Sequence, residues 1–105
     1  MSAEKQFEQL IQHLSGNKDV VLSQLFGKPC LKVKGKAFAA LHKTTLVFKL
    51  SGGAHKQALS QPGAILWDPS GKGRPMKEWV AIPAETLTDA QALSNHALKY
   101  VGAVA

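Results

Sequence analysis

The centre of the chain alternates apolar and polar residues with a period of two, and this pattern restricts the fold more than any other feature. Leu31 and Val33 alternate with Lys32 and Lys34, and a later run alternates Leu46, Phe48 and Leu50 with Thr45, Val47 and Lys49. Successive side chains of a β-strand point to opposite faces, so both runs predict half-buried strands. Lys34-Gly35-Lys36 and Lys43-Thr44 have the composition of tight turns on either side of residues 37–42. The pattern therefore predicts a three-stranded meander.

Helical patterns stand at both ends of the chain. Phe7, Leu10, Ile11 and Leu14 follow the i, i+3, i+4, i+7 spacing of an amphipathic helix, which Ser2 can cap. Residues 88–91, Thr-Asp-Ala-Gln, form a capping box that opens a last helix, which runs to about residue 101. Residues 54–60 predict a short helix that ends before Pro62-Gly63. Residues 64–67 and 77–82 predict two more strands, joined as a hairpin by a Gly-rich loop.

These elements predict an α+β domain of two layers that spans residues 1–105. The expected order is α-β-β-β-α-β-β-α, with a mainly antiparallel five-stranded sheet and the helices on one face. Residues 20–26 are ambiguous, because their apolar run suits either a helical turn or an extended linker. The predicted core combines the apolar stripes: Phe7, Leu10, Ile11, Leu14, Leu31, Val33, Leu46, Phe48, Leu50, Leu93 and Ala97.

The composition is that of a globular protein, and the charge is unevenly distributed along the chain. The sequence is 45% hydrophobic and 19% charged, with a formal net charge of +6. Residues 28–77 contain ten basic residues and one acid, a balance of +9, whereas the remaining residues sum to −3. Such asymmetry predicts a basic surface that attracts polyanions. The alternative is that the lysines keep a solvent-facing sheet soluble and its edges unpaired.

The best polyanion-binding candidates are the lysines of the first hairpin and the cations around the Gly-rich loop. Loop side chains project from a rigid scaffold, and Trp79 adjoins them as an aromatic that could stack on a base. Trp67 and Trp79 can equally be packing residues of the sheet. The candidate residues are Lys32, Lys34, Lys36, Lys72, Arg74, Lys77 and Trp79.

The sequence predicts no catalytic, cofactor or metal site. His13, His42, His55 and His96 lack the spacing of a zinc motif, and Cys30 is expected to be a small buried residue. Residues 68–74 resemble a phosphate-binding loop in their glycines and cations, but they lack the GxxxxGK[ST] spacing. A hairpin loop is the expected structure. Three open possibilities for function are an interaction module, direct nucleic-acid binding and a cryptic enzyme.

The expected compartment is the cytoplasm. The chain has a single cysteine, which suits a reducing environment, and a polar N-terminus without the apolar core of a signal peptide. No window approaches 18 consecutive apolar residues, so no membrane partner is expected. The expected partners are a protein or a nucleic acid, and the expected state is a monomer or a weak dimer.

Several segments in this order resemble the N-terminal domain family of TfoX/Sxy competence regulators. The matching segments are Leu25–Pro29, Leu31–Ala39, Leu46–Leu50, Gly73–Val80 and the last helix. The neighbouring MmcQ/YjbR family is a second resemblance, through a lysine-rich strand and a tryptophan before the last helix. The TfoX resemblance implies a small stand-alone member, an α+β fold and an association with transcriptional control of DNA uptake. It implies no catalytic residues, so the expected function is a non-catalytic interaction module, an accessory in transcriptional regulation.

Overall fold

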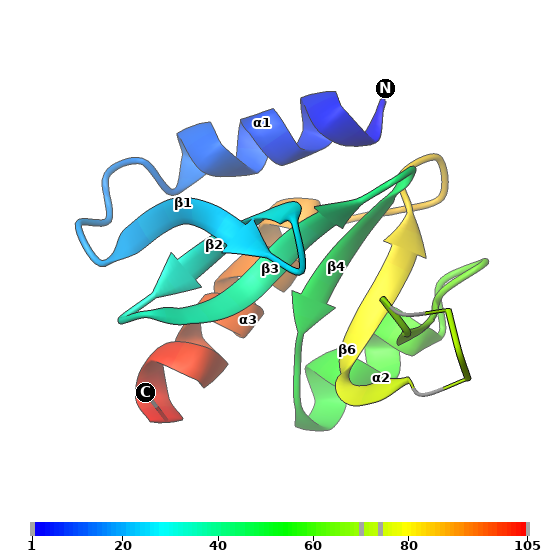
Figure 1. Cartoon of the computed structure of the whole chain (residues 1–105). Helices are drawn as coiled ribbons and strands as arrows, with labels where there is room; N and C mark the ends of the chain where they lie inside the picture. The colour runs from blue at the N-terminus through cyan, green and yellow to red at the C-terminus, as the bar shows by residue number, and fades with distance from the viewer. Residues whose placement is uncertain (1, 70, 74, 105) are drawn as a thin grey trace.

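The computed structural model describes residues 2–69, 71–73 and 75–104, which form three helices and one open antiparallel sheet of six strands (Figure 1). The strand order is β1-β2-β3-β4-β6-β5. The two-layer α+β class is as predicted, with one strand more. The elements are α1 (Ala3–His13), β1 (Val20–Leu25), β2 (Lys28–Val33), β3 (Lys36–His42), β4 (Thr45–Lys49), α2 (Gly52–Leu59), β5 (Ile65–Trp67), β6 (Met76–Pro83) and α3 (Ala90–Val104).

The additional strand is β1, the segment whose type the sequence left open. It pairs with β2 from Val20↔Val33 to Leu25↔Lys28, across a two-residue turn of Phe26 and Gly27. Both turn residues have positive φ, 54° and 75°, which matches the twist of a tight hairpin. β1 lies at an edge of the sheet and exposes apolar side chains on both faces. Its sequence therefore lacks the alternation of a half-buried strand.

All three helices lie on one side of the sheet and contribute to one main core. The predicted parity is confirmed, because Leu31 and Val33 are buried in the helix-side core whereas Lys32 between them is only half-buried. Every predicted core residue is buried except Ile11, which is half-buried and packs against that core. The helix that begins at Ala3 is capped as predicted, since Ser2 Oγ accepts from the Lys5 N–H at 3.2 Å.

A β-bulge in β3 adds a residue to the main core that the alternation did not predict. The register with β2 shifts between Leu31↔Ala39 and Lys32↔Ala37, so Phe38 is the extra residue. Phe38 and Ala39 both contact the helix-side core, and both are buried. A bulge places two consecutive side chains on the same face, which a strict period of two cannot do.

The predicted capping box of the last helix is wrong. α3 begins at Ala90, one residue later than the box requires, and Asp89 precedes it with a φ of 56°. The Thr88 N–H, which the side chain of Gln91 would reach in a capping box, instead donates to Gln61 Oε1 at 3.0 Å. A contact from the loop before β5 has therefore replaced the local cap.

Candidate functional site

The helix-free face of the sheet carries a second, smaller hydrophobic cluster. We call Cys30, Ala40, Val47, Trp67, Trp79 and Ala81 the tryptophan cluster; all six are buried. Cys30, Ala40, Val47 and Ala81 stand side by side on β2, β3, β4 and β6. Because these residues are small, the sheet has room for two indole rings on this face. The prediction that Cys30 is a small buried residue is confirmed.

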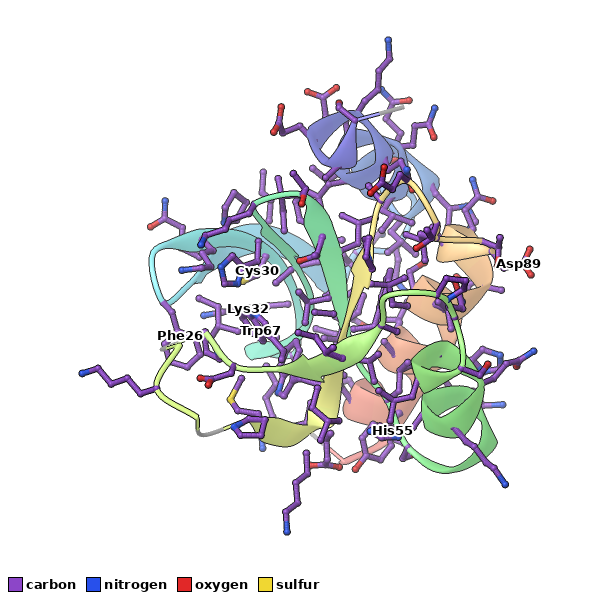
Figure 2. All side chains as sticks on the ribbon, turned by 90° about the vertical axis from the view of Figure 1, so that its right-hand side faces the viewer. Phe26, Cys30, Lys32, His55, Trp67 and Asp89 are labelled. Carbon is purple, nitrogen blue, oxygen red and sulfur yellow. The ribbon has the colours of Figure 1, made fainter. Side chains whose placement is uncertain are left out.

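Trp67 is the centre of the cluster and connects distant parts of the sheet. Its ring centroid lies 5.3 Å from that of Trp79 and 6.1 Å from that of Phe26 in the β1–β2 turn. Its Nε1–H donates to Nδ1 of His42 at 2.6 Å. Trp67 is on the edge strand β5, whereas Phe26 adjoins the opposite edge, so the sheet must curl to bring them together. Figure 2 shows Phe26, Cys30, Lys32 and Trp67 gathered inside this curl.

Both titratable side chains at the cluster are held in their neutral forms. Burial raises the pKa of the Cys30 thiol above its usual 9.0, while the charge of Lys32 opposes this shift. Burial lowers the pKa of His42 below its usual 6.5, and the charges of Lys28 and Lys43 lower it further. Since Nδ1 of His42 accepts the hydrogen bond from the indole N–H, the neutral imidazole carries its own proton on Nε2. Both groups are therefore suited to packing rather than to nucleophilic or acid chemistry at neutral pH.

Half-buried lysines surround the cluster on the same face. Lys32 pairs with Ala37, which packs against the cluster, and Lys49 pairs directly with Trp79. Lys32 on β2 and Lys49 on β4 are separated by one strand, β3, and both stand on the helix-free face. Lys28 is two residues before Cys30 on β2 and pairs with Leu25, which also packs against the cluster. Their half-burial beside apolar residues is typical of lysines whose stems cover apolar surface while their ammonium groups reach solvent.

Lys28 and Lys49 are site residues that the sequence-based selection missed. Their positions could have been inferred from strand parity. Lys49 alternates with the buried Phe48 and Leu50, so it must point to the face opposite the helices, as Lys32 does. The selection instead favoured lysines close together in sequence, and two of these, Lys34 and Lys36, stand in or beside the β2–β3 turn.

The structure separates the lysines of the predicted hairpin group. Lys32 is half-buried on the helix-free face, and Lys36 is exposed at the start of β3. Lys34 lies in the β2–β3 turn with a φ of 51°, and its Nζ donates to the Gly102 carbonyl near the end of α3 at 3.5 Å. Lys34 therefore faces the helix layer, where a cation suits the negative end of a helix.

The candidate cations of the Gly-rich loop lie next to the tryptophan cluster. The glycines of this loop form hydrogen bonds within the loop. The Asp68 carboxylate accepts from the N–H groups of Gly71 at 3.1 Å and Gly73 at 2.8 Å. These N–H groups are turned inward, so they do not form the cradle of a phosphate-binding loop. Lys72 and Lys77 are exposed, whereas the predicted Arg74 lies outside the described residues. Trp79 is only 8% exposed, so its ring packs in the sheet.

Four of the seven acids lie on the helix side of the sheet. Glu4 and Glu8 belong to α1, and Asp89 precedes α3, away from the tryptophan cluster in Figure 2. Glu78 accepts a hydrogen bond from the Tyr100 hydroxyl of α3, a contact that raises the pKa of Tyr100 above its usual 10.0. The helices also carry Lys5, Lys56 and Lys99, so the helix layer is mixed in charge.

A pocket of about 190 Å³ lies at one end of the cluster, lined by His42, Lys43, Thr45, Ile65, Trp67 and Asp68 among others. Among the described residues, no three His, Cys, Asp or Glu side chains gather as metal ligands would. None of the described helices is long and apolar enough to cross a membrane.

Comparison with known proteins assigns the family. Residues 12–101 match the family model described as the TfoX N-terminal domain. No curated protein and no solved structure matches the chain. The match includes every strand, α2 and most of α3, and it agrees with the resemblance of the hairpin and loop segments. The chain therefore belongs to the TfoX N-terminal domain family.

Proposed function

We propose that this domain is a non-catalytic binding module whose helix-free sheet face contacts the phosphate backbone of nucleic acids. The observation that carries the proposal is the placement of Lys28, Lys32 and Lys49 on one face of the sheet, the face opposite the helices. Lys28 and Lys32 are four residues apart on β2, or about 13 Å, and Lys49 is two strands away on β4. Three cations at these spacings suit a polyanion, whose charges recur along a line.

The partly buried stems strengthen this assignment. A half-buried lysine beside the apolar Ala37, Leu25 or Trp79 is already restricted, so it loses less side-chain entropy when its ammonium meets a phosphate. The exposed ring of Phe26, 60% accessible at the rim of the same face, offers a surface on which an unpaired base can stack. Lysine supplies point charges rather than bidentate contacts, so binding with little sequence preference is proposed.

The test is a comparison of two triple variants with the same loss of charge. Lys28→Gln/Lys32→Gln/Lys49→Gln removes the proposed site, whereas Lys5→Gln/Lys56→Gln/Lys99→Gln removes one exposed lysine from each helix. Binding to random duplex and single-stranded DNA is measured by fluorescence anisotropy between about 50 and 200 mM salt.

The site variant is expected to lose at least about tenfold in affinity at low salt. A plot of the logarithm of its affinity against the logarithm of the salt concentration should be shallower than that of the parent by about 2 to 3. The helix-side variant retains a slope close to that of the parent. Equal losses in both variants would show that net charge alone causes the binding. Absence of binding by the parent protein at low salt would remove the proposal.

The biological role that we propose is that of an accessory in transcriptional regulation. Membership in the TfoX N-terminal domain family supports this role, and it agrees with a cytoplasmic protein that has access to DNA or RNA. The proposal predicts that transcript levels change when the site variant replaces the parent protein in the cell, but not when the helix-side variant does.

A further inference from the structure

The outer edge of β1 is a long strand edge without the usual protection against pairing. We propose that a second copy of this chain pairs antiparallel with β1, around a two-fold axis at Leu22. The sheet ends at β1 on one side and at β5 on the other. β5 has only three residues, and a short strand is one way in which proteins protect an edge. β1 has six residues and contains no charge and no proline.

The backbone of β1 presents hydrogen-bonding groups in the correct direction. In a two-residue hairpin the closing pair, here Leu25 and Lys28, is hydrogen-bonded, and bonded pairs then alternate along the strand. Leu22 and Gln24 therefore direct their N–H and C=O groups away from β2. The Val20 N–H agrees with this alternation, because it donates to the Asn17 carbonyl rather than to β2. In the described part of the chain, no strand pairs with this side of β1.

The side chains of β1 also favour a partner. Val21 is 57% exposed on the helix-free face and Leu22 is 55% exposed on the opposite face. A hollow of about 330 Å³, lined by Leu22, Ser23, Gln24 and Pro29, borders the strand. A paired strand would cover apolar surface on both faces, which an isolated edge leaves in contact with water.

Self-pairing is favoured over another extended peptide because β1 complements itself. Outward-directed residues must lie opposite one another, so a two-fold axis at Leu22 places Leu22 against Leu22 of the second copy and Val20 against Gln24. This register also brings Asp19, just before β1, opposite Leu25 of the other copy. Leu25 pairs with Lys28, so an acid of one copy approaches a cation of the other at both ends of the interface.

The dimer would have one consequence for the proposed function. A two-fold axis perpendicular to the sheet keeps both helix-free faces on the same side of one continuous sheet. The two groups of lysines would then form one longer basic surface. Only this consequence depends on the proposed nucleic-acid binding, and the dimer itself is measured without nucleic acid.

The test measures molecular mass by sedimentation equilibrium at physiological salt, up to about 1 mM protein. The parent protein is expected to shift from monomer to dimer as its concentration rises. Leu22→Lys is expected to stay monomeric over the whole range, because a charge on the edge opposes pairing. Ile65→Lys is the matched control, since Ile65 is a 62% exposed apolar residue on the other edge strand. It is expected to dimerise as the parent does.

A parent protein that stays monomeric at about 1 mM would overturn the proposal. So would a dimer that Ile65→Lys disrupts and Leu22→Lys leaves intact, provided that circular dichroism shows both variants folded. The register has its own test in Leu22→Cys with oxidised glutathione as the oxidant, because Cys30 is 0% exposed and does not compete. A disulfide dimer is expected from Leu22→Cys and not from Ile65→Cys, and the reverse result would contradict the proposed pairing.

Discussion

The indole Nε1–H of Trp67 donates to Nδ1 of His42 at 2.6 Å, although two strands separate their positions in the sheet. Trp67 is on β5 and His42 ends β3, with β4 and β6 between them. The hydrogen bond therefore spans the concave side of the curled sheet. The bond also requires that Nδ1 of His42 carry no proton. Protonation of His42 at low pH would therefore break the contact between Trp67 and His42.

We expect the free energy of unfolding to fall as the pH drops below about 6.5, the usual pKa of histidine. The pKa of His42 is lowered in the folded protein, by burial first and then by Lys28 and Lys43. The unfolded chain thus binds a proton at a higher pH than the folded protein does. The contribution of neutral His42 to stability is therefore complete above the pKa that His42 has in the unfolded chain. It is lost as the pH falls through the lower pKa that His42 has in the folded protein.

The measurement is urea denaturation between about pH 8 and pH 5. His42→Gln keeps an acceptor for Trp67 but does not titrate, so the difference between parent and variant isolates His42 from Asp68 and other nearby groups. The two proteins should differ in the slope of stability against pH. Identical slopes would show that the imidazole is not linked to folding.

Trp67→Phe should destabilise the domain by about 2 to 4 kcal/mol, since it leaves a cavity and removes the hydrogen bond to His42. Trp79→Phe is the matched control, because Trp79 belongs to the same cluster and its indole makes no such bond to His42. The variant at Trp67 should also raise the pKa of His42 toward its usual value, measured by NMR titration of the imidazole protons. An unchanged titration would mean that Trp67 does not control His42.

Gly63→Ala should cost more stability than Gly71→Ala. Both glycines have positive φ, 78° and 68°, so each alanine adds backbone strain of about 1 to 2 kcal/mol. At Gly63 a new Cβ would also lie 2.8 Å from Pro83 Cγ, whereas at Gly71 it would meet nothing within 4 Å. Relieving that contact must shift Pro83 at the end of β6, which adds about 1 to 3 kcal/mol. Chemical denaturation measures the free energy of unfolding of both variants. Equal losses would show that the contact between a Cβ at position 63 and Pro83 costs no stability.

The loop cations remain a prediction of their own. Replacing Lys72, Arg74 and Lys77 together by Gln should weaken DNA binding to a similar extent across sequences and reduce the salt slope. The stability of the fold should change little, because exposed charges contribute little to it. Parent-like affinity at low salt would exclude the loop from the site, and a variant that does not fold would assign the loop a structural role.

The meander and its turns were predictable because their signals are local. Leu31 and Val33 directly flank Lys32 in the sequence, and the strand pleat alone sends them to the face opposite Lys32. Lys34 and Gly35 supply the positive φ that a two-residue turn requires. The type of β1 was not predictable in this way, because an edge strand with apolar residues on both faces shows no period.

The candidate site was only partly predictable. Lys32 has the expected position on the sheet face, but Lys34, two residues later, has left the strand for the turn and contacts Gly102. Lys49 is on the same face as Lys32, although 17 positions separate them in the sequence. Which lysines share a face depends on strand parity and on where each strand ends, and their closeness in sequence does not decide it.

The sequence by itself determined the two-layer architecture, the buried face of each central strand and the apolar stripe of each helix, because these depend on periods of a few residues. Only the tertiary structure decided that Phe26, His42, Trp67 and Trp79 meet on the helix-free face. Their meeting depends on the curl of the whole sheet, which accumulates from the twist between neighbouring strands. No local pattern encodes that curl, since it arises from strand order and from the packing of small residues such as Ala40 and Ala81 beneath the indoles.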